Sequence, residues 1–361
     1  MKFLLVNWTT SKDLKGVCEA VFSDLGTILT GMGHETKSVS FNSVKDIIGG
    51  GIERDDMKFF EVEASHMIDR YCSHYMKLFP ETRIISNAGV TNFWYKKPNT
   101  INIFNDPYRA IVNGLLKWGL YGLKTYNKYG NICALMQEGG AEGAKNIAVS
   151  EFMANEMMKI GITPDRTIRH GVDTELFKPM KREEIRVKYG IPNDMPVIVW
   201  SKDFHPVAGF HILSQLIRKF SDVFWVLNFK SGQSYRPKAK NVKIVQPMER
   251  ERMAEFYNLG DLCINPSIVE SFGLAPLEAM SCGIPCVLNN TGFVWDRSIE
   301  DEITERPYGL IVNQWQVKPY EKAIKMMLDG GKKLKPRKWV IDNGYTIERW
   351  SGEWKDLIKK I

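Results

Sequence analysis

The chain has 361 residues, 44% of them hydrophobic, and a formal net charge of +7 at pH 7. This length exceeds what one hydrophobic core usually serves, so two domains are expected. The six cysteines have no disulfide-framework spacing, and no charged-then-apolar leader or apolar run of about 18 residues occurs, which favours a cytoplasmic protein over a secreted or membrane-spanning one.

The first half of the sequence alternates short apolar runs with amphipathic segments. Apolar residues recur at helical spacing from Leu14 to Leu29. Runs of strand length lie at residues 2–6, 37–41, 83–86, 100–104, 131–135, 146–149 and 166–169. Continuous apolar strands separated by helix-length segments predict a parallel sheet covered on both faces.

The second half repeats this pattern. Its strand-length runs lie at residues 197–200, 223–227, 242–245, 261–265, 285–288 and 309–312. Glycine, proline and a run of charges interrupt the pattern at 170–184, which marks the junction. The sequence therefore predicts an α/β fold of two doubly wound, Rossmann-like domains. Since such sheets bind ligands at the carboxyl ends of their strands, two domains in series predict a cleft between them.

The stretch 270–280, ESFGLAPLEAM, holds two carboxylates on either side of a glycine and a proline. Pro276 and Gly283 predict the start and end of a short helix, with Glu278 in its first turn and Glu270 in the preceding loop. Amides at this helix start would favour a phosphate group. Alternatively, Glu278 serves only the helix dipole and Glu270 is a solvated loop acid. The residues themselves leave both readings open.

Residues 261–292 resemble the donor-site signature of retaining glycosyltransferases with the GT-B fold, in the GT4 family. The signature is a Glu, seven residues and a second Glu, with Phe-Gly-Leu between them. The resemblance implies that Glu270 contacts hydroxyls of a donor sugar and that Glu278 holds the ribose of its nucleotide. It also implies backbone contacts with the diphosphate and sugar, made by Phe272, Gly273 and Leu274.

Other segments extend the resemblance over most of the chain. Residues 170–179 are similar to the family's interdomain element, with His170 where Asn is usual, and residues 344–361 resemble its closing helix, which returns to the first domain. The expected domains are therefore 1–173, which would bind the acceptor, 174–340, which would bind the donor, and a returning helix at 341–361.

The sequence departs from the family at its phosphate-binding cations. The family has Gly-Arg after the first strand of the second domain and a Lys six residues past that Arg. Here Ser201 and Lys202 replace the pair, and Ala208 stands at the Lys position. Lys202 keeps a charge near the expected diphosphate but lacks the planar fork of Arg. Lys230 and Arg236 are candidates to compensate, although both also suit a solvated basic loop.

The first domain offers two further candidates. Asp106 follows a predicted strand where relatives often have a His, so it could meet donor or acceptor hydroxyls; as the residue before Pro107, it could equally start a turn. Gly16 lies where the first loop of the family approaches the donor, or is a glycine at a helix start. His66 and His74 lack ligand partners at suitable spacing, so we expect surface histidines and no metal site.

Residues 92–129 are rich in aromatic residues and Lys. No recognised nucleic-acid motif accompanies them, so no nucleic-acid partner is expected. A surface that rests on a membrane or binds a sugar face is one interpretation, and a helix pair that packs its aromatics internally is the other.

Taken together, the resemblance implies transfer of a sugar from a UDP- or GDP-sugar to a hydroxyl of a glycan, glycolipid or protein-linked sugar. It implies retention of the anomeric configuration and no metal or other cofactor, with helix amides and basic groups neutralising the leaving phosphate. The missing Lys at Ala208 supports an alternative, a catalytically silent nucleotide- or sugar-binding protein. An epimerase or phosphorylase on the same fold is a third hypothesis.

Overall fold

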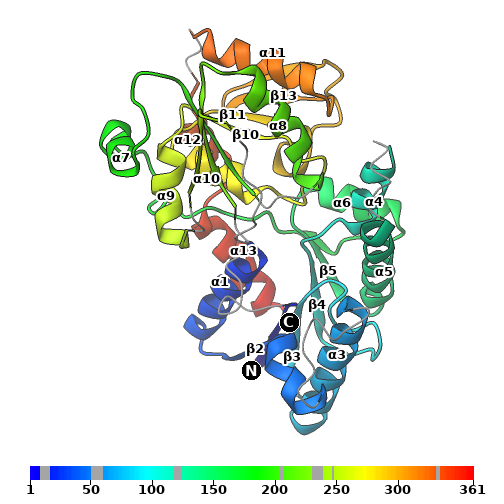
Figure 1. Ribbon diagram of the computed structural model, residues 1–361. Helices are drawn as coiled ribbons and strands as arrows, with labels where there is room; N and C mark the ends of the chain where they lie inside the picture. Colours follow the sequence, from blue (N-terminus) through cyan, green and yellow to red (C-terminus); the bar gives the residue numbers. More distant parts are fainter. Residues whose placement is uncertain are drawn as a thin grey trace. The chain divides into compact units, whose positions relative to one another are not determined.

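The computed structural model describes residues 1–8, 17–49, 60–117, 124–202, 206–229, 239–245, 248–330 and 334–361. They form two compact units (Figure 1). Unit 1 comprises Met1–Arg169 and Ser351–Ile361, and unit 2 comprises His170–Trp350. Among the helices described, none is both long and apolar enough to cross a membrane.

Unit 1 is built on a sheet of parallel strands in the order β2-β1-β3-β4-β5-β6. The strands are β1 (Lys2–Val6), β2 (Glu35–Val39), β3 (Arg83–Asn87), β4 (Thr100–Phe104), β5 (Lys145–Ala148) and β6 (Arg166–Thr167). Strands β1, β3, β4 and β5 are almost entirely buried, as expected for a parallel sheet with helices on both faces. β2 lies at the sheet edge and is largely exposed.

The helices of unit 1 cover both faces of this sheet. They are α1 (Val17–Gly31), α2 (Phe41–Val44), the π-helical turn η1 (Lys45–Gly49), α3 (Phe60–Leu78), α4 (Tyr108–Lys117), α5 (Lys124–Ala141) and α6 (Glu151–Lys159). Figure 1 shows α3, α4 and α5 on one face and α1 on the other.

The strand predicted at 131–135 is wrong, because these residues lie within α5. Cys133, Ala134 and Met136 are buried while Leu135 is 55% exposed, which is a helical pattern of burial. A short apolar run cannot by itself distinguish a strand from a segment of a helix. The crossover between the parallel strands β4 and β5 needs a covering helix, and this segment supplies it.

Unit 2 has a sheet in the order β12-β13-β11-β10-β7-β8-β9, parallel except for β12. The strands are β7 (Val197–Ser201), β8 (Phe224–Asn228), β9 (Val242–Val245), β10 (Leu262–Asn265), β11 (Cys286–Asn289), β12 (Ile303–Arg306) and β13 (Gly309–Val312). The sequence pattern misses β12 because this antiparallel edge strand reads ITER and contains no apolar run.

Helices also cover both faces of the second sheet. They are α7 (Arg182–Tyr189), α8 (Phe210–Lys219), α9 (Arg250–Asn258), α10 (Leu274–Ser281), α11 (Val317–Leu328) and α12 (Pro336–Asp342), with short 3-10 turns η3 (Pro206–Ala208) and η4 (Gly292–Val294). The last helix, α13 (Ile347–Lys359), begins in unit 2 and ends in unit 1. Figure 1 shows α8 and α11 on one face and α9, α10 and α12 on the other. These sheets and helices confirm the predicted α/β fold of two Rossmann-like units; the expected cleft between them stays a prediction.

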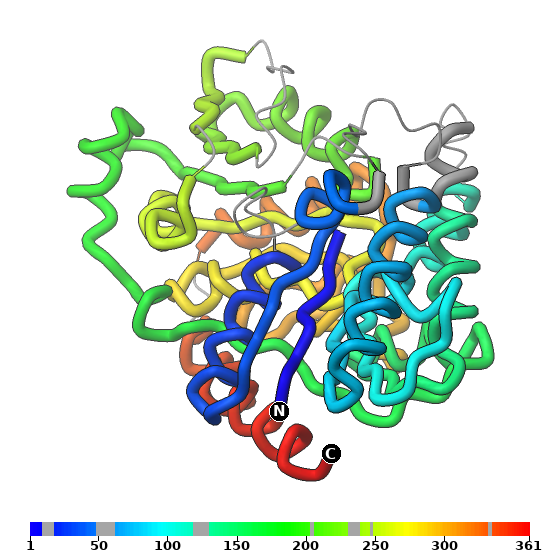
Figure 2. Tube along the Cα trace, turned by 90° about the horizontal axis from the view of Figure 1, so that it is seen from below, coloured from blue at the N-terminus to red at the C-terminus, as the bar shows by residue number. Residues whose placement is uncertain are grey.

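The last turns of α13 return to unit 1. Arg83, at the start of β3, donates a hydrogen bond to the main-chain oxygen of Ile361. The carboxyl terminus therefore lies at the amino edge of the first sheet, close to Met1 (Figure 2).

Candidate functional site

The acidic stretch occupies the loop between β10 and α10, at the carboxyl edge of the second sheet. Gly273 adopts the left-handed conformation, with φ of 98°, at the N-cap of α10. The helix consequently begins at Leu274, which makes Pro276 its third residue and Glu278 its fifth. The prediction that Glu278 lies in the first turn is therefore wrong, because the glycine starts the helix earlier than the proline indicated.

Glu270 lies in a polar, nearly closed environment. Its carboxylate forms an ion pair with the Lys202 ammonium, and Asn265 Nδ2 donates a hydrogen bond of 3.0 Å to its Oε1. The two side chains of the ion pair are 14% and 26% exposed, respectively. Burial alone would raise the pKa of this carboxyl, but Lys202 and then Asn265 hold the pKa below its usual value. The carboxylate is thus charged and already ordered.

Residues 291–293 form hydrogen bonds with the backbone of the loop. The Glu270 N–H donates to Thr291 Oγ1 at 3.0 Å, and the Phe293 N–H donates to the Phe272 carbonyl at 2.8 Å. Gly292 has φ of 65°, and a Cβ at this position would overlap the Phe272 carbonyl. Only glycine allows this close approach, which fixes the path of the loop.

The Phe272 ring belongs to the core of unit 2. It is 2% exposed and packs edge-on against His170, with ring centroids 5.1 Å apart. Burial, and then the charge of Arg349, lowers the pKa of His170 to about 3, so its imidazole is neutral. The contact of Phe272 with a ligand would therefore come from its backbone, as the resemblance implied.

Glu278 is partly exposed and accepts a 2.8 Å hydrogen bond from the Tyr257 hydroxyl. Burial, and then the charge of Glu278, raises the pKa of Tyr257 well above its usual value, so the hydroxyl stays protonated and donates. Leu274 and Ala275 open α10, and N–H groups in a first turn have no partner within their helix. One helix therefore presents amides for an anion at its start and an oriented carboxylate one turn later.

The segment after β7 borders the same loop. The Ile268 N–H donates to the Val207 carbonyl at 2.8 Å, and a Cβ on Gly209 would overlap the Pro266 carbonyl. Ala208, where the family has Lys, is 4% exposed. Among the described residues the Ser201 hydroxyl, at the end of β7, is buried and has no hydrogen-bond partner.

Asp106 belongs to unit 1, where it follows β4 at the carboxyl edge of the first sheet. Asn87 Nδ2 donates to Asp106 Oδ2 at 3.4 Å and to Asn7 Oδ1 at 3.2 Å. Gln137 Nε2 donates to the Asp106 carbonyl at 2.7 Å. Asp106 is therefore part of an amide-rich cluster at the ends of β1, β3 and β4.

The structure thus brings together Glu270 and Lys202, and places Phe272, Gly273, Leu274 and Glu278 on the adjoining loop and helix. Gly16, Lys230 and Arg236 lie outside the described residues. Sequence reasoning missed Tyr257 and Asn265, which donate hydrogen bonds to the two carboxylates, and Thr291, which bonds the backbone of Glu270. Only Asn265 carried a signal, because it ends a predicted strand next to the acidic stretch.

The remaining candidates lie elsewhere on unit 1. His66 and His74 are exposed, and within the described ranges no three or more His, Cys, Asp or Glu side chains are grouped to hold a metal ion. Trp94 and Tyr95 are 41% and 39% exposed, and the His66 ring lies 5.3 Å from that of Trp94.

Known proteins are similar to this chain in two respects: the sequence of the segment that contains the site, and the fold. Residues 181–346 match the family model described as Glycosyl transferases group 1. The matched segment lies within unit 2 and includes Lys202, Glu270 and Glu278. The D-inositol 3-phosphate glycosyltransferase 2 of Catenulispora acidiphila is 26% identical over 212 residues, which cover 52% of this chain and 48% of that protein. The corresponding enzyme of Xylanimonas cellulosilytica is 30% identical over 40% of each chain. The chain thus spans about half the length of the curated relatives it matches.

Solved glycosyltransferase structures share the fold over the whole chain. Sucrose-phosphate synthase from Thermosynechococcus elongatus has a TM-score of 0.77 at 16% identity, covering 100% of this chain and 98% of that one. Anabaena HepE, solved in complex with UDP and glucose, has a TM-score of 0.68 at 15% identity, covering 100% of both chains. These likenesses confirm the GT-B fold, whereas the match to the group 1 glycosyltransferases covers residues of unit 2 only.

Proposed function

We propose that the chain transfers a sugar from a nucleotide-activated donor to a hydroxyl group of a glycan or glycolipid acceptor. The observation that carries the proposal is the arrangement of Glu270, Lys202 and Glu278 around the start of α10, inside the segment that matches the group 1 glycosyltransferases. The fold likeness to HepE, solved with UDP and glucose, supports a donor of this class.

In this proposal each part of the site meets one part of the donor. The diphosphate lies at the first amides of α10, where the helix dipole favours negative charge. Glu278, oriented by Tyr257, accepts hydrogen bonds from the ribose. Glu270 accepts hydrogen bonds from hydroxyls of the sugar, and Lys202 faces the charge that develops on the leaving phosphate. The proposal assigns charge neutralisation to these protein groups and uses no metal or cofactor.

We further propose that the anomeric configuration is retained. A leaving phosphate can accept the proton of the attacking hydroxyl on the face from which it departs, so the proposed reaction needs no separate base. Analysis of the anomeric proton of the product by NMR tests this, and an inverted product would contradict it.

A second candidate function is a binding protein that recognises the same nucleotide-sugar without transfer. It is favoured by Ala208, which is buried where the family has a Lys. It is also favoured by the Lys202–Glu270 ion pair, because this ion pair neutralises the cation expected to act on the phosphate.

The decisive experiment incubates the chain with a panel of UDP- and GDP-sugars, with water or glycans as acceptors, and measures release of the nucleoside diphosphate. Titration with UDP and GDP alone measures binding separately. Release of the nucleoside diphosphate above background supports transfer, and binding without release supports the silent binding protein. If the chain shows neither binding nor release, both functions are excluded.

Two substitutions separate the proposed roles of the carboxylates. Glu278→Ala should weaken nucleotide binding by about 1.5–3 kcal/mol, because a carboxylate that holds the ribose loses charge-assisted hydrogen bonds. Glu270→Ala should spare nucleotide binding and reduce turnover. Glu305→Ala, at an exposed position on β12, is the control and should change neither quantity. Equal loss of binding in both site variants would contradict the division of roles.

A membrane surface is a further proposed partner of unit 1. Trp94 and Tyr95 are exposed beside Lys96, and aromatic residues with a cation suit the membrane–water interface. Co-sedimentation with anionic vesicles tests this: the Trp94→Ala, Tyr95→Ala variant should bind them less than the parent, and equal binding would contradict the proposal.

A further inference from the structure

The ion pair between Lys202 and Glu270 joins two groups that the proposed function assigns to different parts of the donor. Lys202 is assigned to the diphosphate, and Glu270 to hydroxyls of the sugar. In the free chain the Lys202 ammonium contacts the Glu270 carboxylate instead. A diphosphate therefore competes with this carboxylate for the same positive charge.

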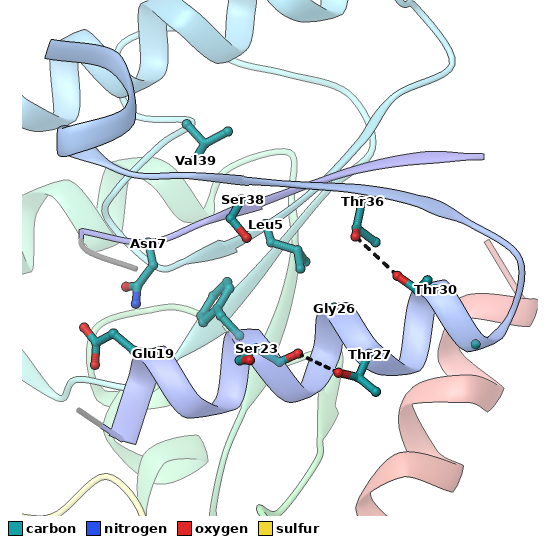
Figure 3. Close-up of a pocket in the computed structure, with 12 residues that line it drawn as sticks. Leu5, Asn7, Glu19, Ser23, Gly26, Thr27, Thr30, Thr36, Ser38 and Val39 are labelled. Carbon is teal, nitrogen blue, oxygen red and sulfur yellow. Dashed lines mark hydrogen bonds between the residues drawn. The ribbon is translucent and has the colours of Figure 1, made fainter. Parts of the chain in front are cut away.

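Other cations do not relieve this competition within the described residues. Ala208 stands where the family has a Lys and is 4% exposed. The pocket of about 600 Å³ between α1 and β2 of unit 1 has no cation among its described lining residues, so it offers no alternative place for a diphosphate (Figure 3). In the described part of the chain, the diphosphate thus depends on Lys202 and on the first amides of α10.

The ion pair can open by movement of side chains alone. The Lys202 N–H donates to the Asn228 carbonyl at 3.1 Å, and the Glu270 N–H donates to Thr291 Oγ1, so both backbones are fixed. The Lys202 side chain has a flexible four-carbon stem and is 26% exposed. Its ammonium can therefore turn toward a phosphate while Glu270, which is 14% exposed, stays in place.

When Lys202 turns away, Glu270 keeps only neutral partners. Lys202 is the one cation at ion-pair distance from Glu270 among the described residues. Asn265 Nδ2 still donates to Oε1 at 3.0 Å. The Ser267 hydroxyl lies beside both the carboxylate and Asn265 Oδ1, but its single hydrogen serves one of them. A largely buried carboxylate that loses its cation is unfavourable.

A bound sugar would compensate for this loss. Hydroxyl groups donate to carboxylates, and hydrogen bonds to a charged group are stronger than those between neutral groups. A nucleotide-sugar brings its hydroxyls together with the diphosphate, whereas a nucleoside diphosphate brings no sugar to Glu270. The two ligands therefore leave Glu270 in different states, hydrogen-bonded in one case and without compensation in the other.

We propose that the Lys202–Glu270 ion pair makes unit 2 discriminate between a nucleotide-sugar and the nucleoside diphosphate that remains after transfer. The nucleotide-sugar is favoured because its hydroxyls replace Lys202 at Glu270. The nucleoside diphosphate is disfavoured because it draws Lys202 away and leaves Glu270 unpaired, and the ion pair forms again as this product leaves. The inference rests on the proposed placement of the donor, and it applies to a silent binding protein as well as to a transferase.

The test measures dissociation constants of the full chain by isothermal titration calorimetry, without an acceptor. The probes are UDP, GDP, UDP-glucose, UDP-N-acetylglucosamine and GDP-mannose. At least one nucleotide-sugar should bind about tenfold more tightly than its own nucleoside diphosphate. This comparison uses the parent alone, so it decides the question even if a substitution impairs folding.

Glu270→Gln identifies the cause of the preference. It releases Lys202 and keeps a side chain of the same shape, so UDP or GDP should bind about fivefold more tightly. Affinity for the preferred nucleotide-sugar should change by less than about twofold, because the ion pair and the charge-assisted bonds to the sugar are lost together. Glu321→Gln is the matched control, since Glu321 on α11 pairs with Lys219 and Lys325, and it should change neither affinity.

The inference is wrong if the parent binds UDP and GDP at least as tightly as the nucleotide-sugars. It is also wrong if Glu270→Gln tightens both kinds of ligand equally, which indicates simple repulsion between carboxylate and phosphate. Unchanged binding of UDP and GDP in this variant would equally contradict it, because Glu270 would then be a sugar contact only. In these three results nucleotides still bind. If the parent binds no nucleotide and no nucleotide-sugar, the proposed function itself fails, and the inference fails with it.

Discussion

The ion pair between Lys202 and Glu270 links the stability of unit 2 to pH. The pKa of Glu270 is lower in the folded chain than its unfolded value of about 4.3. A lowered carboxyl pKa contributes stability that is present above the unfolded pKa and is lost as pH falls through the folded pKa. We therefore expect the parent to lose stability below about pH 4.3 partly through this group.

Glu270→Gln should lower the free energy of unfolding at pH 7 by about 1.5–3 kcal/mol and reduce its dependence on pH below 4.3. Urea unfolding across this pH range measures both effects. Glu175→Gln is the control, because Glu175 and Lys178 form an exposed pair that should contribute little. A pH dependence identical to that of the parent would show that the ion pair does not contribute.

Tyr257 is a positioning residue that acts through Glu278. Tyr257→Phe removes the 2.8 Å hydrogen bond but keeps the ring that packs against Phe177. We expect nucleotide affinity to fall about three- to tenfold, because the carboxylate loses its orientation. Tyr320→Phe is a matched control: Tyr320 is fully buried, and its hydroxyl has no partner among the described residues. Equal nucleotide affinity in both variants would contradict the role of Tyr257.

Strand periodicity predicts most of the parallel strands because each is a short apolar run between turns. It fails where local pattern is ambiguous or absent. Residues 131–135 are apolar enough for a strand, but they lie within α5, and the polar edge strand β12 has no apolar run to detect. The start of α10 is misplaced because the left-handed Gly273, and not Pro276, determines where this helix begins.

The candidate site is predictable only in part, because a sequence motif reveals only residues that are close together in the chain. Glu270, Glu278 and the residues between them are contiguous in sequence, so a motif can reveal them. Their supporting contacts come from separate elements: Tyr257 lies on α9, and Thr291 precedes η4. Such contacts depend on the tertiary fold, and no local spacing specifies them.

The turn at Gly292 packs against the loop at Phe272, so a change in this turn should affect the site. Gly292→Ala should displace the loop at Phe272, because the added Cβ overlaps its carbonyl, and should lower both stability and nucleotide affinity. Gly330→Ala is the control: Gly330 has φ of 80°, but a Cβ there would meet no atom within 4 Å. It should therefore show only the backbone strain, about 1–2 kcal/mol of stability. Nucleotide affinity equal to that of the control would contradict a role for this turn in the site.

Across the whole chain, polar amides recur where parallel strands end. Asn7, Asn87 and Asn105 follow or end strands of the first sheet, and Asn228 and Asn265 end strands of the second. Carboxyl ends of parallel strands collect at one edge of a sheet, so each unit gathers hydrogen-bonding groups at the edge where this class of fold binds ligands. Both units therefore have the means to bind polar molecules, although the family match covers unit 2 only.

Helix α13 is shared between the units and carries two buried tryptophans one turn apart. Trp350 is the last residue of unit 2, and Trp354 belongs to the segment 351–361 that clusters with unit 1. Each is 2% exposed. The boundary between the two units thus falls between two buried tryptophans of one helix.

Truncation of either tryptophan should destabilise one unit more than the other. Trp350→Ala should lower the opening free energy of unit 2, and Trp354→Ala that of unit 1, by about 3–5 kcal/mol, because each leaves a cavity in its own core. Hydrogen exchange followed by mass spectrometry resolves the effect, since peptides from β1, β3 and β4 report on unit 1 and peptides from β7, β10 and β11 on unit 2. Lys355→Ala, at an exposed position on the same helix, should change neither set. If both tryptophan variants accelerated exchange equally in both sets of peptides, the two units would open as one cooperative body, and the assignment of each tryptophan to a separate core would be wrong.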